Sequence, residues 1–484
     1  MQRVVTESSA SEGACEAMAR DRTGLVVCAW REAAQRVGEW IVPDLGRAPT
    51  RIFGRAEPGQ PERLPLWRWR PDGLQPAAPV LSSRISAEQL EITPRGRALH
   101  LRRLGRRELR VRGQRADEAI VEPGDLVELV NEVLFVVAVR PEPQGREVAT
   151  HAFGQPDEDG IIGESPAIWE LRRTLRAVAS LDVHTLVRGP SGSGKELVAR
   201  AIHRLSRRRG GPFVARNAAT IPDTLVDAEL FGHVAGYPTS GMPERPGLVG
   251  AAHRGLLFLD EVGDLPLVVQ PHLLRLLDQG EYHRLGDARA RRSDLRLIGA
   301  TNRPAEDLRA DLGARFLARL ELPGLDQRRE DIVPLAVGLL RRAAERDPWL
   351  AERFFEGGPG GWPRLSYPLQ RSLVLRTYRA HARELLALLL ASATHSPGAE
   401  LEAPTVEVRP ASPGPVTPVV PVEAAPVAAP PVERGLSPSR ILRVLEECNG
   451  VQELAWRQLG LDSRHQLARL IRRHGLAVTR RPSG

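Results

Sequence analysis

Gly189-Pro-Ser-Gly-Ser-Gly-Lys-Glu196 follows a β-type run at 183–188 and precedes a segment with helical periodicity at 196–204. A glycine-rich loop between a strand and a helix binds phosphate through backbone N–H groups and the helix N-terminus. Lys195 is the only lysine among the 68 lysine and arginine residues. Its compact ammonium reaches between backbone amides where a planar guanidinium is too broad. We therefore predict a triphosphate site, with ATP as cofactor, formed by Gly189, Gly192, Gly194, Lys195 and Glu196.

Two later β-type runs end in polar residues that suit the same site. The run at 255–261 ends in Asp260 and Glu261, and the run at 295–302 ends in Asn302. We predict that Asp260 holds Mg²⁺, that Glu261 activates the attacking water, and that Asn302 senses the γ-phosphate. The alternative for the two acids is a solvated pair at a strand end.

The composition of the chain favours a globular protein and indicates the compartment in which it works. The hydrophobic share of 42% and the charged share of 26% are typical of globular proteins. Three widely separated cysteines in no metal-binding spacing favour a reduced cytoplasm, and we expect neither a signal peptide nor a membrane span. The net charge of +8 is compatible with a nucleic-acid partner without proving one.

Composition and periodicity change along the chain and divide it into modules, so we predict a multidomain protein. An all-β sandwich is expected first, then an α/β P-loop NTPase, then a small all-α module. The Pro-rich segment at 396–438 holds 11 of the 41 prolines and cannot form a hydrophobic core. The predicted parts are an unassigned arm at 1–22, the sandwich at 23–141, a linker at 142–158, the α/β region at 159–395, the Pro-rich linker at 396–438 and the all-α module at 439–480.

The central motifs resemble the AAA+ domain of bacterial enhancer-binding proteins, the ATPases that activate sigma-54 RNA polymerase. The resemblance spans about half of the chain, from 161 to about 392. Its motifs are Ile161-Ile-Gly-Glu-Ser165, the loop, Phe213-Val-Ala-Arg-Asn217, Glu229-Leu-Phe-Gly-His233, Leu257-Phe-Leu-Asp-Glu261, Ala300-Thr-Asn302 and Arg328-Arg-Glu-Asp-Ile332.

This resemblance implies that 159–395 divides into an AAA+ α/β core at 159–325 and a helical lid at 326–395. It also implies further site residues and partners. It implies that Asn217 gates Glu261, that Arg309 and Arg315 act as arginine fingers across a subunit boundary, and that Arg383 is the lid sensor. For either arginine alone, a surface charge is the alternative. The resemblance also implies ATPase activity, a homo-oligomer from dimer to hexameric ring, and sigma-54 RNA polymerase as a partner.

Other segments depart from the family pattern. The family loop that grips sigma-54 reads Gly-Ala-Phe-Thr-Gly-Ala, whereas this chain has Gly236-Tyr-Pro-Thr-Ser-Gly241. Thr239 is retained, Pro238 replaces the aromatic residue and fixes φ, and Tyr237 offers a displaced ring. In the lid, Tyr378-Arg-Ala-His-Ala382 replaces the Trp-Pro-Gly-Asn-Val of the family.

The N-terminal sandwich resembles a forkhead-associated (FHA) domain, on the motifs Arg51-Ile-Phe-Gly-Arg55, Ile85-Ser-Ala-Glu-Gln-Leu-Glu-Ile92 and Val121-Glu-Pro-Gly-Asp125. The resemblance implies a phosphothreonine protein as partner, with Arg55 and Ser86 as phosphopeptide-binding residues. Ala87 stands where the family has Arg. A sandwich that docks a partner without phosphate is the alternative.

The C-terminal module resembles the Fis-type helix-turn-helix. Gly450 closes a first predicted helix, and Gly460 allows the turn before a third helix capped by Ser463. Double-stranded DNA is the implied partner, and a solvated basic helix is the alternative. The predicted DNA-binding residues are Arg464, His465, Gln466, Arg469, Arg472 and Arg473.

Two functions remain open from the sequence. In the first, the chain is an ATP-binding, DNA-binding transcriptional regulator that resembles sigma-54 activators and has a degenerate sigma-contacting loop. In the second, it is a sigma-54-independent DNA-binding regulator or scaffold in which ATP only controls assembly.

Overall fold

The computed structural model describes residues 21–44, 51–56, 63–143, 145, 148–303, 309–358, 360–404, 443–444 and 459. The unit from Pro415 to Gly484 therefore contributes three described residues. The predicted helix-turn-helix and its six DNA-binding residues lie outside the described part. Within that part, none of the helices is long and apolar enough to cross a bilayer.

The N-terminal module has two antiparallel sheets in its described residues, as the alternating runs predicted. One sheet has the order β5-β4-β2-β1-β12-β11-β8-β9, and the other has the order β10-β7-β6-β3. The strands are β1 (Arg22–Trp30), β2 (Trp40–Ile41), β3 (Ile52–Phe53), β4 (Leu66–Arg70), β5 (Gly73–Pro76), β6 (Leu90–Arg95), β7 (Ala98–Arg103), β8 (Leu109–Val111), β9 (Gln114–Ala116), β10 (Glu118–Val121), β11 (Leu126–Leu129) and β12 (Val133–Arg140).

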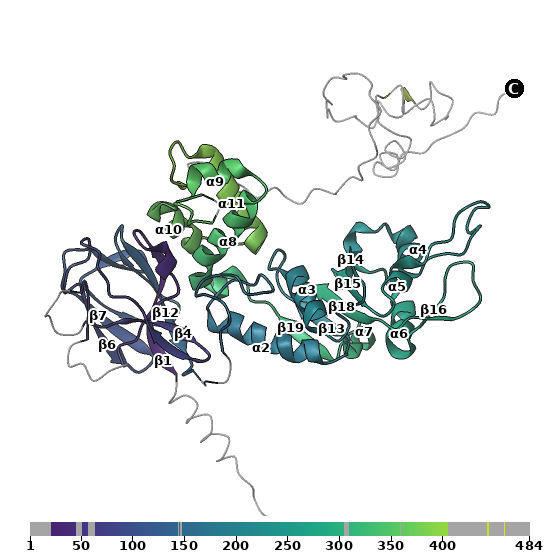
Figure 1. The fold of residues 1–484 in the computed structure, drawn as a ribbon, viewed down its shortest axis with the longest axis horizontal. Helices are drawn as coiled ribbons and strands as arrows, with labels where there is room; N and C mark the ends of the chain where they lie inside the picture. The colour runs from purple at the N-terminus through teal and green to yellow at the C-terminus, as the bar shows by residue number, and fades with distance from the viewer. Residues whose placement is uncertain are drawn as a thin grey trace, which may run out of the picture. The chain divides into compact units, whose positions relative to one another are not determined.

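The central module is a parallel five-stranded sheet in the order β14-β15-β18-β13-β19 (Figure 1). Both of its faces are covered. In β15, Leu256 and Phe258 pack with α2 and α3, whereas Leu257 and Leu259 pack with the helices of the opposite layer. The elements are α2 (Pro166–Ser180), β13 (Thr185–Arg188), α3 (Lys195–Leu205), β14 (Phe213–Asn217), α4 (Val226–Phe231), α5 (Gly247–Ala251), β15 (Leu256–Asp260), α6 (Gln270–Gln279), β16 (Glu281–Tyr282), β17 (Arg291–Arg292), β18 (Arg296–Thr301), α7 (Ala310–Arg315) and β19 (Ala318–Glu321).

The lid follows a 3-10 turn, η7 (Arg329–Asp331). Its helices are α8 (Ile332–Ala344), α9 (Pro348–Phe354), α10 (Tyr367–Leu375) and α11 (His381–His395). The packed lid continues past its predicted end at 395, because Leu401 is fully buried and bridges to Leu365. Residues 396–404 therefore belong structurally to the lid, although the Pro-rich composition placed them in the linker.

Sandwich and lid share one apolar core. Apolar residues of β1 and of the lid helices belong to the same buried cluster. Polar contacts accompany it: the Trp30 amide donates to Gln370 Oε1 at 3.2 Å, and the Tyr367 hydroxyl donates to Glu128 at 2.9 Å. The sandwich therefore packs directly on the lid.

Candidate functional site

The phosphate-binding loop has the predicted strand–loop–helix setting between β13 and α3. Gly192 and Gly194 adopt positive φ angles of 75° and 104°, which the glycines allow without strain. Helix α3 begins at Lys195, and the Lys195 ammonium donates to the Gly189 carbonyl at 3.2 Å. The ammonium is thus folded back over the loop, where it can meet phosphate oxygens.

The two predicted acids lie beside this lysine. Strand β15 ends at Asp260, and Glu261 takes a left-handed conformation with φ of 52°. That turn brings Glu261 Oε1 to 3.7 Å from Lys195 Nζ. Such a conformation is uncommon for a non-glycine residue and is found at functional sites.

Asn302 and Asn217 come from the strands on either side of β15. The backbone amide of Asn302 donates to Glu261 Oε2 at 3.3 Å, so the predicted sensor residue contacts the carboxylate that we predict to activate water. Asn217 is in parallel register with Asp260. Its side-chain oxygen accepts from the Ala219 amide at 2.9 Å, so in this structure it caps its own turn and does not hold Glu261.

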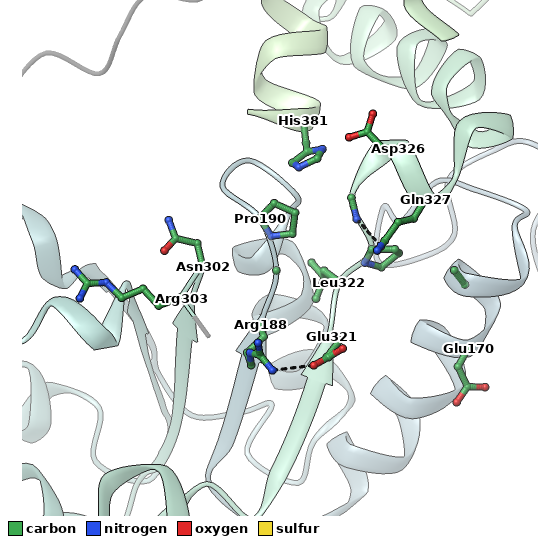
Figure 2. Close-up of a pocket in the computed structure, with 14 residues that line it drawn as sticks. Glu170, Arg188, Pro190, Asn302, Arg303, Glu321, Leu322, Asp326, Gln327 and His381 are labelled. Carbon is green, nitrogen blue, oxygen red and sulfur yellow. Dashed lines mark hydrogen bonds and ion pairs between the residues drawn. The ribbon is translucent and has the colours of Figure 1, made fainter. Parts of the chain in front are cut away.

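Two cavities flank the loop. One, of about 700 Å³, is lined by polar residues that include Arg188, Asn302 and His381. Figure 2 shows Pro190 of the loop and His381 of the lid on neighbouring walls of this cavity. The other, of about 190 Å³, is lined by Ile161, Ile162 and apolar lid residues and also touches Gly194. Both cavities touch the phosphate loop, and the smaller, apolar one suits a nucleotide base.

The lid touches the loop directly at the start of α11. The Ala382 amide donates to the Gly192 carbonyl at 3.1 Å. A Cβ on Gly192 would lie 2.2 Å from the Ala380 carbonyl and 3.3 Å from Arg383 Cβ. Arg383 therefore stands next to the phosphate loop, as its predicted sensor role requires.

His381 was not predicted as a site residue. It has a φ of 39° at the position where the family pattern has Asn, and Asn tolerates that left-handed conformation well. Its Nδ1 accepts from the Leu325 amide at 3.1 Å, and burial lowers the pKa of His381. The departure from Asn was the sequence signal that could have identified it.

The two predicted fingers pair with carboxylates of their own chain. Arg309 precedes α7 and pairs with Asp311 at 2.7 Å, and Arg315 ends α7 and pairs with Asp278 at 2.5 Å. All four side chains are more than one third exposed. Exposed pairs of this kind are weak and can be exchanged for another partner.

The structure also describes the predicted phosphopeptide-binding residues and the predicted sigma-contacting loop. Arg55 and Ser86 are adjacent, since the Arg55 amide donates to the Ser86 carbonyl at 3.0 Å. The Ser86 hydroxyl accepts from the Arg106 amide at 3.1 Å. In the other loop, Pro238 and Thr239 are exposed, and Tyr237 is 40% exposed with its ring against Gly286.

Comparison with known proteins matches residues 161–321 to the family described as "Sigma-54 interaction domain". The chain is 35% identical over 329 residues to the transcriptional regulatory protein ZraR of Salmonella typhimurium, covering 65% of this chain and 68% of that protein. It is 35% identical over 333 residues to the DNA-binding transcriptional regulator NtrC of Bradyrhizobium sp., covering 69% of this chain and 61% of that protein.

The chain spans between about one third and two thirds of the length of these and other curated relatives. Among solved structures, NtrX of Brucella abortus in complex with ATP aligns with a TM-score of 0.45 and 26% identity. The alignment covers 67% of this chain and 70% of that one.

Proposed function

Since the chain belongs to the family of sigma-54-dependent AAA+ transcriptional regulators, we propose that it binds and hydrolyses ATP and regulates transcription from DNA. The observation that carries this proposal is the contact of Lys195 and Asn302 with the same carboxylate, Glu261, at the edge of a glycine-rich loop. That arrangement provides a cation for phosphate oxygens and a carboxylate for the attacking water.

The residues at this edge also fit a magnesium ion. Mg²⁺ in phosphoryl-transfer sites takes one or two protein carboxylates, and phosphate and water supply the other ligands. Asp260 is the carboxylate that would hold it, since it ends β15 one residue before Glu261. The ion would neutralise charge on the phosphate oxygens, while Lys195 and Arg383 position them.

Assembly would complete the site. We assign Arg309 and Arg315 to the nucleotide of a neighbouring copy in a homo-oligomer, from dimer to hexameric ring. Their exposure supports this assignment. Asn217 would then turn from its present cap to Glu261 when nucleotide binds.

The two terminal modules would connect the ATPase to its partners. Double-stranded DNA would be bound by the C-terminal residues Arg464 to Arg473, on sequence evidence alone. The N-terminal sandwich would bind a phosphothreonine protein through Arg55 and Ser86, whose backbones are joined by a hydrogen bond.

A second function is favoured by the loop at 236–241. The family's gripping aromatic is replaced by Pro238, and the only neighbouring ring, that of Tyr237, packs against Gly286 rather than projecting freely. In this alternative the protein is a sigma-54-independent DNA-binding regulator or scaffold, and ATP controls only its assembly.

The experiment compares ATP turnover with isomerisation of a sigma-54 polymerase–promoter complex, using the full chain and Lys195→Ala as the inactive control. We expect turnover by the wild type alone, together with isomerisation. Turnover without isomerisation would replace the activator function by the second one. Absence of both nucleotide binding and turnover in the wild type would refute the enzymatic proposal.

A further inference from the structure

The segment 160–165 forms one wall of the apolar cavity beside the phosphate loop. Gly160, Ile161 and Ile162 line that cavity together with Ser193 and Gly194 of the loop. The segment is not part of a helix or strand, so its position depends on the groups that bind it. The contacts that fix 160–165 therefore determine the shape of the cavity that would receive the nucleotide base.

One set of these contacts comes from within the ATPase core. Arg172 of α2 donates to the carbonyls of Ile161 at 2.9 Å and Gly163 at 2.8 Å. On the other side, Asp331 accepts from the amides of Glu164 at 2.7 Å and Ser165 at 3.1 Å. Burial and the neighbouring Glu330 raise the pKa of Asp331 to about 6.

The second set comes from the N-terminal sandwich. Arg70, the last residue of β4, donates to Glu164 Oε1 at 2.9 Å, and both side chains are almost fully buried. The same guanidinium donates to the His151 carbonyl at 2.9 Å. The Glu164 carboxylate also accepts from the Gly154 amide at 2.8 Å and from Trp169 Nε1 at 3.1 Å.

A parallel contact holds the turn that carries Asp331. Arg140, at the end of β12, pairs with Glu330 at 3.4 Å, and its guanidinium is fully buried. The segment 160–165 lies directly against the turn at Asp331, because a Cβ on Gly163 would lie 2.6 Å from Asp331 Oδ2. Arg70 thus binds the segment 160–165, and Arg140 binds the turn to which that segment is hydrogen-bonded.

We propose that the N-terminal sandwich completes the nucleotide site of the ATPase. Arg70, acting through Glu164, is a positioning residue that holds segment 160–165 in the shape that receives the base of a purine nucleotide. This inference rests on the proposed binding of ATP. It makes the sandwich a structural part of the enzyme in addition to any partner that it binds.

The test uses the full chain and measures the dissociation constant of a fluorescent ADP analogue, together with amide hydrogen exchange of 160–168 without nucleotide. We expect Arg70→Gln to weaken binding roughly tenfold, about the effect of one lost charge-assisted hydrogen bond. Exchange of 160–168 rises in the same variant, while turnover at saturating ATP changes less than affinity. Arg70→Lys, which keeps the charge, recovers part of the affinity.

Arg36→Gln is the matched control. Arg36 also lies in the sandwich, pairs with a buried carboxylate, that of Glu39 at 2.7 Å, and donates to a backbone carbonyl, but it makes none of the contacts with Glu164. Its loss should lower the thermal midpoint comparably and leave affinity and exchange unchanged. Arg172→Gln should reproduce the Arg70→Gln phenotype without touching the sandwich.

Wild-type affinity and exchange in Arg70→Gln would overturn the inference, as would equal weakening in Arg36→Gln at the same loss of thermal midpoint. A wild type that binds no nucleotide would instead overturn the proposed function, and the inference with it. The two failures are therefore distinguishable.

Discussion

The contact between Glu128 of β11 and Tyr367 of the lid allows the shared core to be tested quantitatively. The Tyr367 hydroxyl is buried and donates to the carboxylate at 2.9 Å, and Arg371 Nε donates to it at 2.8 Å. Burial and the adjacent carboxylate raise the pKa of Tyr367, so the phenol stays a donor. A hydrogen bond to a charged group contributes about 1.5–3 kcal/mol.

Tyr367→Phe should therefore lower the free energy of unfolding by about 2 kcal/mol. Glu128→Ala should lower it by about 3 kcal/mol, because it leaves a buried hydroxyl without a partner, whereas the half-exposed Arg371 regains water. The double variant should cost less than the sum, with a coupling energy of about 1.5 kcal/mol or more.

The assay is urea unfolding of the full chain, followed by tryptophan fluorescence. Tyr378→Phe is the control, because Tyr378 is equally buried but donates to the Leu373 carbonyl at 2.8 Å, within the lid. Its effect should add to that of Glu128→Ala within about 0.5 kcal/mol. Zero coupling between Glu128 and Tyr367 would refute the shared core of sandwich and lid.

Three further outcomes are expected. Lys195→Ala should weaken binding of the fluorescent ADP analogue, and Glu261→Gln should retain binding while ATP turnover falls about a hundredfold or more; equal turnover by Glu261→Gln and wild type would contradict the assigned role. Burial tends to raise the pKa of Glu164, but donors from His151, Arg70 and Gly154 hold it below its usual value. The ionised Glu164 carboxylate therefore stabilises the folded state above about pH 4.5, and this contribution is lost as the pH falls. The destabilisation by Arg70→Gln, measured by urea unfolding, should thus be larger at pH 7 than at pH 4, and a pH-independent difference would exclude this origin. Leu401→Ala should cost about 2–5 kcal/mol in the same assay if 396–404 belongs to the lid, whereas a neutral effect would return the segment to the linker.

The cluster of Lys195, Glu261 and Asn302 could be predicted from sequence because parallel strands bring their carboxyl ends to one edge of a sheet. Glu261 and Asn302 each come at the end of a β-type run, and Lys195 ends the glycine-rich loop that follows another such run, so local pattern was sufficient to place them. The strand-rich character of the sandwich followed in the same way from short β-type runs broken by Gly and Pro.

The contacts between modules could not be predicted. Arg70 and Glu164 are 94 residues apart, and Glu128 and Tyr367 are 239 apart. No periodic pattern in the sequence relates the two residues of either pair. In a sequence so rich in arginine, the position of a single arginine does not indicate which carboxylate it contacts. The composition of 396–404 was misleading for a related reason, since one buried leucine outweighs the prolines around it.

The sandwich contacts both structures that enclose the nucleotide site. Through Arg70 it binds the segment that lines the base cavity, and through Glu128 it binds the lid, whose α11 contacts the phosphate loop. If the lid rotated alone, it would break the contacts of Tyr367 and Arg371 with Glu128 and expose part of a common core, at a cost of several kcal/mol. Rotation of lid and sandwich together would preserve those contacts and strain the link between Arg70 and Glu164 instead. We therefore expect a ligand that shifts the sandwich to change the affinity of the proposed base cavity for nucleotide, and by reciprocity nucleotide to change the affinity of the sandwich for that ligand.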